Sequence, residues 1–331
     1  MLAPIAWATP PAAYGPWEQV TSHLTEGLVA RGHDVTLFAT GTSRTAGTLV
    51  ATVPAGYAEQ PGPDPKVLEH LHIGRVMERA NEFDLVHNQF DFMPLGFSTQ
   101  IRPPLVTTVH GFSSEQIVSV YRYFNTYAHY VSISNANRHP DLTYAATVYN
   151  GIDTQLFTVC TEPDDYLLYF GRIHPEKGAH EAIEIALKTK RPLLMAGLIQ
   201  DHSYFDQMIK PKIDGVQIKY VGNVGPEARD QLMGKAAALL HPISFEEPFG
   251  LSVAESLMTG TPVLAYPLGS MPELIDDGKN GYLPDNADEA AEMMSQTTNL
   301  DRERIAREAR ERFGVEAMVN GYLRVYEELL D

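Results

Sequence analysis

The sequence predicts an α/β protein made of two doubly wound, Rossmann-like domains that face each other across a cleft. Three observations support this fold class. The chain has 331 residues, which is more than one hydrophobic core usually holds. Short apolar runs alternate with amphipathic stretches, the pattern that parallel βαβ units produce. One aperiodic stretch, residues 150–163, interrupts this alternation near the middle of the chain, and we interpret it as the connection between the domains.

The first series of elements defines a predicted domain of residues 1–153. Its first helix is followed by Arg31-Gly32-His33, with a glycine where helices commonly end. The other elements are predicted from apolar runs and from helical periodicity. We predict strands at 2–7, 34–39, 84–87, 104–110, 130–134 and 146–149, and helices at 16–31, 67–80 and 113–127.

A second series follows the predicted linker, residues 154–164, and defines a domain of residues 165–314. We predict strands at 166–170, 192–196, 216–221, 237–241 and 262–265, and helices at 176–189, 225–234, 251–259, 287–298, 300–313 and 315–330. In doubly wound sheets, ligands bind beyond the carboxyl ends of the strands. The loops that follow strands are therefore the first places to look for a site.

The charge of the chain argues against two classes of partner. Asp and Glu outnumber Lys and Arg by 42 to 25, which gives a net charge of −17. Residues 1–153 carry 8 basic and 13 acidic side chains, or −5, and residues 154–331 carry 17 and 29, or −12. Such a surface repels nucleic acid and anionic lipid at long range. We expect no nucleic-acid partner and no stable membrane association, and the oligomeric state is left open.

The cysteine content and the apolar runs indicate a compartment. Cys160 is the single cysteine, so no disulfide can form within the chain, and we expect a structural role for it. No run approaches the roughly 18 apolar residues of a membrane span, and the N-terminus lacks the features of a signal peptide. These observations predict a cytoplasmic protein.

The first motif that carries chemistry follows the strand predicted at 166–170. It reads Gly171-Arg172-Ile173-His174-Pro175-Glu176-Lys177-Gly178 and continues into a helix. Gly171 allows a close turn, and Arg172 and Lys177 bring two cations beside a helix N-terminus, a combination that suits a pyrophosphate. The alternative is a solvated loop whose charges pair with Glu176 or Glu181. The residues alone do not separate these two interpretations.

The second motif follows the strand predicted at 237–241. Glu247 and Glu255 flank the segment Pro248-Phe249-Gly250-Leu251, which begins the next helix. Gly250 and Glu255 lie about 7–8 Å apart along the helix axis, close to the distance from a diphosphate to its ribose. Free N–H groups at 249–251 could bind a phosphate or a sugar hydroxyl. Helix capping explains Glu246 or Glu247 equally well, but not Glu255.

Other candidates have simpler explanations. His70 and His72 do not share a face of their predicted helix, so we interpret them as surface histidines rather than a metal pair. The aromatic residues of the 113–127 helix are expected to pack in the core with a partly wet edge; they are Tyr121, Tyr123, Phe124 and Tyr127. Ser132 and Ser134 lack a paired base in the sequence, which disfavours a serine hydrolase.

Taken together, these segments resemble family 4 of the glycosyltransferases, which have the GT-B fold, and within it a compact subgroup that includes transferases of small molecules. The resemblance covers nearly the whole chain. The matching segments are 32–36, 109–111, 150–153, 171–178, the pair Glu247 and Glu255, and 260–263. One departure is visible in the first βα loop, where the family often has Gly-Gly and this chain has Tyr14-Gly15.

The resemblance implies retaining transfer of a hexose from a nucleotide-diphosphate sugar, without a bound metal or other cofactor. The N-terminal domain would bind the acceptor and the C-terminal domain the donor, and the last helix, 315–331, would pack back on the first domain. The implied catalytic residues are His110, Arg172, Lys177 and Glu247. The implied donor-binding residues are Gly15, Gly171, Arg172, Lys177, Val224, Glu247, Phe249, Gly250, Leu251 and Glu255.

These roles agree with the chemistry of the residues. Charge develops on the diphosphate as the glycosidic bond breaks, and fixed cations stabilise it best in a dry site. No Asp-x-Asp occurs in the chain, so Arg172 and Lys177 are expected to replace a metal. UDP-glucose is the first expected donor and GDP-mannose the second, with a small soluble acceptor. The alternatives are a nucleotide-sugar epimerase or phosphorylase on a related fold, and a sugar-nucleotide-binding protein without turnover.

Overall fold

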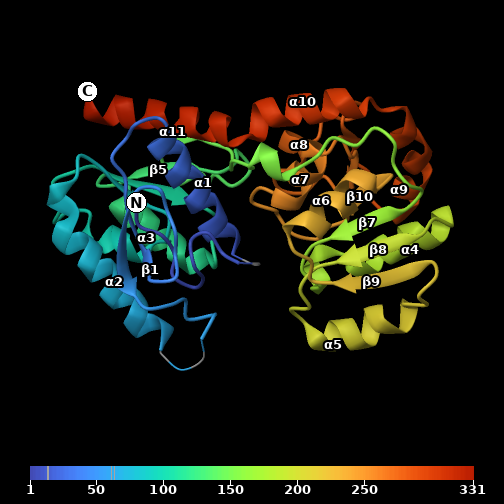
Figure 1. The fold of residues 1–331 in the computed structure, drawn as a ribbon, viewed down its shortest axis with the longest axis horizontal. Coiled ribbons are helices and arrows are strands. Elements are labelled where there is room, and N and C mark those ends of the chain that lie inside the picture. Colours follow the sequence, from blue (N-terminus) through green and yellow to red (C-terminus); the bar gives the residue numbers. More distant parts are fainter. Residues whose placement is uncertain (13–14, 61, 63) are drawn as a thin grey trace. The chain divides into compact units, whose positions relative to one another are not determined.

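The structure is a computed structural model that describes residues 1–12, 15–60, 62 and 64–331. The chain divides into two structural units (Figure 1). Unit 1 comprises Met1–Gly151 and Val315–Asp331, and unit 2 comprises Ile152–Gly314. Each unit has parallel sheets flanked by helices, which confirms the predicted α/β class.

Unit 1 contains two parallel sheets that the N-terminal segment connects. Their orders are β1-β2 and β3-β4-β5-β6, and Leu2 forms bridges to both Phe38 of β1 and Asn88 of β3. The strands are β1 (Thr36–Thr40), β2 (Thr48–Val53), β3 (Val86–Asn88), β4 (Leu105–Val109), β5 (His129–Ser132) and β6 (Tyr144–Thr147). The helices are α1 (Pro16–Ala30), α2 (Pro65–Arg79), α3 (Val118–Phe124) and α11 (Val315–Leu330).

Three expectations for unit 1 were wrong in detail. The segment 2–7 is not a full strand, because only Leu2 forms a bridge before the chain bends away. Strand β2 was missed, since it is half-exposed and follows a polar stretch that indicates a loop. The helix expected at 113–127 is shorter: a 3₁₀ turn, Glu115–Ile117, precedes α3, which ends at Phe124.

Helix α11 belongs to unit 1 although it follows all of unit 2 in the sequence. It packs against α1, and the two helices approach closely at Gly27. A Cβ at Gly27 would lie 2.4 Å from Cγ2 of Val319, so any larger residue would force the helices apart. Segments from opposite ends of the sequence therefore complete one core together.

Unit 2 contains one parallel sheet with the strand order β12-β11-β10-β7-β8-β9. Helices α4 and α9 pack together over one part of its core, and α7 packs with α10 and α6. The strands are β7 (Leu167–Phe170), β8 (Leu193–Ala196), β9 (Ile218–Gly222), β10 (Ala238–His241), β11 (Val263–Ala265) and β12 (Gly281–Tyr282). The helices are α4 (Ala179–Thr189), α5 (His202–Tyr204), α6 (Pro226–Lys235), α7 (Leu251–Met258), α8 (Met271–Leu274), α9 (Ala287–Met293) and α10 (Arg302–Phe313).

Two parts of unit 2 differ from the prediction. The strand series does not close at β11, because Gly281–Tyr282 pairs with it as β12 after a turn. The sequence between β8 and β9 is helical, with α5 continuing as Phe205–Ile209 and Lys210–Lys212. Strand β12 and each of the three short helices are too short for periodicity to detect, and the helix Lys210–Lys212 contains a proline.

The predicted linker, 154–164, is an integral part of unit 2. The backbone N–H of Cys160 donates to the carbonyl of Thr259 at 3.0 Å, and that of Asp164 donates to Lys235 at 2.8 Å. The guanidinium of Arg302 donates to the carbonyl of Cys160 at 2.5 Å. The segment lacks periodicity because it runs across helices rather than forming one.

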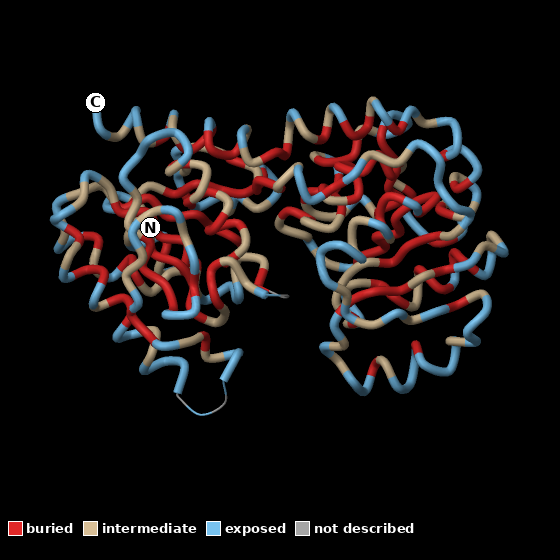
Figure 2. The backbone as a smooth tube through the Cα atoms, in the orientation of Figure 1, coloured by how far each residue is buried: buried red, intermediate tan, exposed pale blue. Residues whose placement is uncertain are grey.

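Burial follows the strands of each unit, whereas the outer helix surfaces are exposed (Figure 2). His72 is fully buried, which corrects the expectation of a surface histidine: its Nε2 lies 2.8 Å from the carbonyl of Ala3, and its Nδ1 contacts Thr52. Tyr121 is buried and Tyr123 is 74% exposed, as a core helix with a wet edge requires. No helix in the described ranges is both long and apolar enough to cross a membrane.

Candidate functional site

The two predicted motifs of unit 2 meet at the carboxyl ends of neighbouring strands. Strands β7 and β10 are paired, and the loops that follow them are in direct contact. The N–H of Ser244 donates to the carbonyl of Glu176 at 2.9 Å. Gly178 has φ +70°, and a Cβ there would lie 1.8 Å from the carbonyl oxygen of Pro242. The close fit requires glycine, and it places Lys177 beside the second loop.

Lys177 and Glu247 form an ion pair between these loops. The Lys177 ammonium also lies 4.5 Å from the centre of the Phe245 ring, a cation–π contact. Both charged side chains are largely buried, with exposed fractions of 14% and 12%. The pair therefore joins the two motifs that the sequence singled out, and the alternative partners of Lys177, Glu176 and Glu181, are not the ones it uses.

His241, the last residue of β10, is the third member of this cluster. Its Nε2 lies 3.6 Å from Oε2 of Glu247, just beyond hydrogen-bond range. Within the described part of the chain, this buried nitrogen has no hydrogen-bond partner. Burial lowers the pKa of His241, so the ring is neutral at pH 7. A buried, unpaired nitrogen beside a carboxylate can bind a hydroxyl or phosphate group of a ligand.

Glu247 remains ionised across the physiological range. Burial alone would raise the pKa of Glu247, but the Lys177 ammonium paired with it outweighs this effect, and the pKa is lowered to about 2. The backbone carbonyl of Glu247 also accepts from the N–H of Ser270 at 2.9 Å, which fixes the loop. The cluster thus offers an anion and a cation side by side, suited to hydroxyl and phosphate groups respectively.

Glu255 lies in α7, and its partner is Arg229 of α6. Nη1 of Arg229 lies 2.9 Å from Oε1 of Glu255, and the carboxylate side chain is 12% exposed. Burial raises the pKa of Glu255, and Arg229 partly offsets this effect. The spacing of Glu255 from Gly250 matches the expectation, because α7 begins at Leu251.

Arg172 does not join Lys177 in the structure. Its guanidinium donates to Oε1 of Gln200, and its carbonyl accepts from the Tyr169 hydroxyl at 2.8 Å. Gly171, the preceding residue, donates its N–H to Ala196 of the neighbouring strand at 3.0 Å. The two cations of the first motif therefore have different surroundings. Lys177 contacts the second motif, whereas Arg172 lies at the edge formed by β7 and β8.

The remaining predicted donor-binding residues of unit 2 lie at two helix starts. Gly250 is the N-cap of α7, with φ +86°, and Phe249 is buried against Phe313 with ring centres 6.0 Å apart. Val224 is half-buried and precedes the N-cap of α6. Glu246, expected as a possible helix cap, instead accepts from the N–H of Gly269 at 2.6 Å.

His110 lies in unit 1, directly after β4. It is 7% exposed and stacks on Trp17 of α1, with ring centres 5.1 Å apart. Its Nε2 lies 2.7 Å from Oε1 of Gln89. Burial lowers the pKa of His110 to about 3, so the imidazole is neutral and cannot serve as a cation at pH 7.

Gly15 is the N-cap of α1. Tyr14, which stands where the family often has the first glycine of Gly-Gly, lies outside the described residues. A Cβ at Gly15 would lie 2.9 Å from Cβ of Pro11 and 3.1 Å from Oε2 of Glu18. Glu18 is 3% exposed and accepts from the N–H of Trp7 at 3.2 Å. The predicted phosphate-facing glycine therefore lies beside a buried carboxyl group.

Glu18 makes the stability of the protein depend on pH. Burial raises the pKa of Glu18 from 4.5 to about 7, so between these values the folded chain binds more protons than the unfolded chain. Stability from this group is greatest below pH 4.5 and falls as the pH rises to 7. Glu18→Gln should therefore stabilise the protein by on the order of 2–3 kcal/mol at pH 8 and by little at pH 4, as measured by urea unfolding.

Glu26→Gln is the matched control, because Glu26 also lies in α1 and accepts a backbone N–H, that of Ala46 at 3.0 Å. Its stability relative to the unaltered protein should change less between pH 4 and pH 8 than that of Glu18→Gln. If the difference between Glu18→Gln and the unaltered protein were the same at pH 4 and pH 8, the buried-carboxyl explanation would be wrong.

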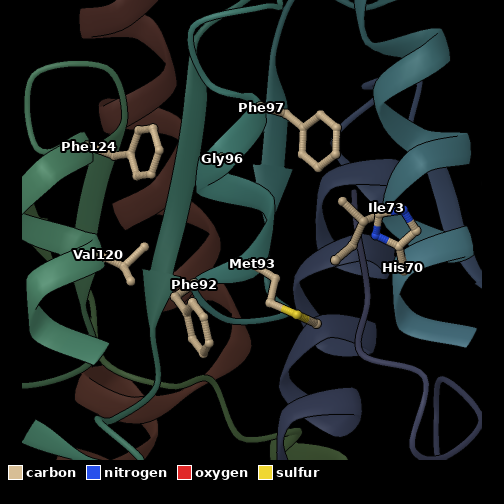
Figure 3. Close-up of a pocket in the computed structure, with 8 residues that line it drawn as sticks. All are labelled: His70, Ile73, Phe92, Met93, Gly96, Phe97, Val120 and Phe124. Carbon is tan, nitrogen blue, oxygen red and sulfur yellow. The ribbon is translucent and has the colours of Figure 1, made fainter. Parts of the chain in front are cut away.

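A separate apolar pocket opens in unit 1 between α2, the 3₁₀ helix Met93–Phe97 and α3. Its volume is about 300 Å³, near the lower limit of small-molecule sites, roughly 300–1,000 Å³. Figure 3 shows side chains from all three segments around it. The lining residues are His70, Ile73, Phe92, Met93, Gly96, Phe97, Val120 and Phe124. Such a lining suits a hydrocarbon or aromatic group rather than a charged one.

Sequence reasoning missed three residues that the structure brings to these clusters: His241, Arg229 and Gln89. His241 could have been found as a polar residue that ends a buried strand just before the Glu247 motif. Arg229 and Gln89 carry no local signal, since their partners are 26 and 21 residues away. Among the residues that the structure describes, no three His, Cys, Asp or Glu side chains are arranged to hold a metal ion.

Two α/β units with parallel sheets are the architecture that the resemblance to the GT-B glycosyltransferases implies. Comparison with known proteins agrees. The family model for glycosyl transferases group 1 matches residues 158–314, and the model for glycosyltransferase family 4 matches residues 17–156. The chain belongs to family 4 of the glycosyltransferases and is a hexosyltransferase.

Similar proteins span most of the chain. Glycogen synthase of Mycobacterium tuberculosis is 25% identical and covers 84% of this chain and 80% of its own length. The structure of a glycosyltransferase involved in avilamycin A biosynthesis is 25% identical, covers 98% of this chain and 92% of its own, and has a TM-score of 0.70. An Anabaena protein solved in complex with UDP and glucose has the same fold, with a TM-score of 0.74 at 23% identity over 95% of this chain and 96% of its own.

Proposed function

We propose that the protein transfers a hexose from a nucleotide-diphosphate sugar to a small soluble acceptor, with retention of the anomeric configuration and without a bound metal ion. The observation that carries this proposal is the buried Lys177–Glu247 pair with His241 beside it, after paired strands of unit 2. UDP-glucose is the first donor to test and GDP-mannose the second. The presence of UDP and glucose in the Anabaena relative supports this order.

Lys177 and Glu247 would exchange partners when the donor binds. Without a donor, the ammonium and the carboxylate neutralise each other. A diphosphate would draw Lys177 to itself, with Arg172 as a second cation, and Glu247 would then accept hydrogen bonds from hexose hydroxyls. Because this region excludes most water, each charge interaction is stronger there than at the surface. Before this exchange the carboxylate is ionised, since its pKa is about 2 while Lys177 lies beside it.

The donor's nucleoside would lie along α7 and α6. Glu255 is buried and paired with Arg229, and its carboxyl oxygens can accept from the ribose hydroxyls. Main-chain groups at Phe249, Gly250 and Leu251 would bind phosphate or sugar oxygens at the start of α7. Gly171 and Val224 would line the same site through their backbone, and Gly15 would approach the phosphates from unit 1.

Retention follows if the acceptor attacks on the face from which the diphosphate leaves. The bond from the anomeric carbon to the phosphate oxygen breaks, and a bond to the acceptor oxygen forms on the same face. The acceptor proton passes to the leaving phosphate oxygen, so no separate base is needed. His110 would contribute hydrogen bonding beside the anomeric carbon, because its ring is neutral. The pocket in unit 1 suggests acceptors with an apolar part.

The proposal is tested by donor release and product structure. A thermal-shift panel of nucleotide sugars selects the donor, since a ligand at about 100 times its Kd stabilises a protein by about 2.7 kcal/mol. We expect release of the nucleoside diphosphate to depend on an acceptor, to persist in EDTA, and to give a product with the donor's anomeric configuration by NMR.

Each alternative predicts a different result. An epimerase would change the sugar without releasing nucleotide, a phosphorylase would require phosphate, and a binding protein would show a thermal shift without turnover. Loss of activity in EDTA that Mg²⁺ restores would disprove metal independence. A glycosyl adduct on Glu247, detected by mass spectrometry, would disprove same-face attack.

A further inference from the structure

A chain of buried hydrogen bonds connects His110 to helix α11. Nε2 of His110 lies 2.7 Å from Oε1 of Gln89. Nε2 of Gln89 lies 3.1 Å from Nε2 of His87, and Nδ1 of His87 lies 2.5 Å from the hydroxyl of Tyr326. Gln89 and His87 are 0% and 2% exposed. The chain of bonds lies wholly within unit 1.

In the orientation that the structure gives it, the amide of Gln89 sets the direction of every bond in this chain. Its oxygen can only accept, so Nε2 of His110 carries a proton and donates it. Its nitrogen can only donate, so Nε2 of His87 is bare and accepts. The proton of His87 is therefore on Nδ1, which donates to the hydroxyl of Tyr326. The opposite orientation of the amide would reverse all three bonds together.

A neighbouring hydroxyl is compatible with this direction. Oγ1 of Thr108 lies 2.8 Å from the same Nε2 of His87 and 2.7 Å from the hydroxyl of Tyr322. Thr108 can donate to the bare nitrogen while it accepts from Tyr322. In this arrangement Nε2 of His87 accepts, and its Nδ1 donates to Tyr326.

The consequence for His110 is a fixed tautomer. With the proton on Nε2, Nδ1 is bare, and no residue in the described part of the chain hydrogen-bonds to it. Stacking on Trp17, at an interplanar angle of 19°, holds the ring plane. A bare ring nitrogen can only accept, so it suits a hydroxyl group of a substrate.

We propose that Tyr326, His87 and Gln89 are positioning residues that hold His110 in the Nε2–H tautomer, so that Nδ1 accepts a hydrogen bond from a hydroxyl of the hexose or the acceptor. Only the catalytic consequence rests on the proposed function. The tautomer itself is a property of unit 1 and can be measured without any substrate.

The direct test is the tautomer of His110, read from its ring ¹⁵N shifts by NMR in the full-length protein at pH 7. The signals are assigned with His110→Gln. We expect protonated Nε2 and bare Nδ1 in the unaltered protein. Gln89→Met, which keeps the length of the side chain but removes both bonds, should give a mixture of tautomers. Tyr326→Phe should do so more weakly, because it removes only the acceptor of His87.

Tyr130→Phe is the matched control. Its hydroxyl is also buried and donates to the carbonyl of Tyr121 at 2.7 Å, but it is not part of the hydrogen-bonded chain. It should leave the His110 signals unchanged. A protonated Nδ1 in the unaltered protein would overturn the proposal, and so would unchanged His110 signals in both Gln89→Met and Tyr326→Phe.

Kinetics test the catalytic consequence separately. The loss of one buried hydrogen bond should lower kcat of Gln89→Met by roughly tenfold, with the KM for the nucleotide sugar nearly unchanged, because the donor contacts in unit 2 remain. A roughly tenfold rise in KM with no change in kcat would contradict a positioning role. If no nucleotide sugar is turned over at all, the proposed function fails, while the NMR result still decides the tautomer.

Discussion

Lys177→Ala should lower kcat by about two to three orders of magnitude, the effect of removing one preorganised donor from a site of developing charge. The ammonium is the only cation paired with Glu247 among the described residues, and in the proposed reaction it stabilises the leaving diphosphate. The measurement is the rate of nucleoside diphosphate release at saturating donor and acceptor. Affinity for the nucleoside diphosphate should also fall, since its charge would lose a partner.

Lys188→Ala is the control for this prediction. Lys188 lies in α4 and pairs with Glu184 and Asp288 at an exposed position, where ion pairs contribute little. It should leave both rate and stability nearly unchanged. If Lys177→Ala folded normally and kept its turnover, the assignment of Lys177 to the diphosphate would be wrong.

The second large effect concerns Gly178 and is measured as a loss of stability. Gly178→Ala should destabilise the protein by about 4 kcal/mol. About 1–2 kcal/mol comes from the left-handed backbone at φ +70°. The remainder, up to about 3 kcal/mol, comes from overpacking, because the new Cβ would lie 1.8 Å from the carbonyl oxygen of Pro242. Urea unfolding measures this loss, and turnover should fall with it because Lys177 moves.

Gly215→Ala separates these two contributions. Gly215 has nearly the same backbone conformation, φ +72°, but nothing lies within 4 Å of its added Cβ. It should cost only about 1–2 kcal/mol and should leave turnover unchanged. Equal losses of stability in the two variants would show that the contact between the loops after β7 and β10 carries no energy of its own.

Much of the fold could be predicted because its elements carry local signals. Helix α11 was predicted at 315–330 and spans those residues, because its apolar residues recur with helical periodicity over four turns. Strand β12 was missed because two residues, Gly281 and Tyr282, are too few for any pattern. The stretch 154–164 was mistaken for a linker because its packing partners, such as Thr259 and Lys235, are distant in the sequence.

The candidate site shows the same limit more sharply. Lys177, Glu247 and Glu255 could be selected because each lies in a loop or helix start that follows a predicted strand. The pairing of Lys177 with Glu247 could not be foreseen, since 70 residues separate them and Glu176 and Glu181 are nearer in the sequence. The apolar pocket likewise could not be predicted from the sequence, because its lining residues come from three separate segments. The roles of all these residues stay predictions until the variants are measured.

Unit 1 is closed by a helix that the ribosome makes only after unit 2. Residues 152–314 form an uninterrupted unit, so unit 2 has its complete sequence while α11 is still unmade. Val319 and Tyr322 of α11 are buried in the finished protein. Until α11 is made, the surface of unit 1 that receives them stays uncovered. The partner for His87 arrives on the same helix. Newly made chains therefore acquire the sequence of unit 2 before that of α11, and a chain that stops short of Tyr326 lacks the acceptor for Nδ1 of His87.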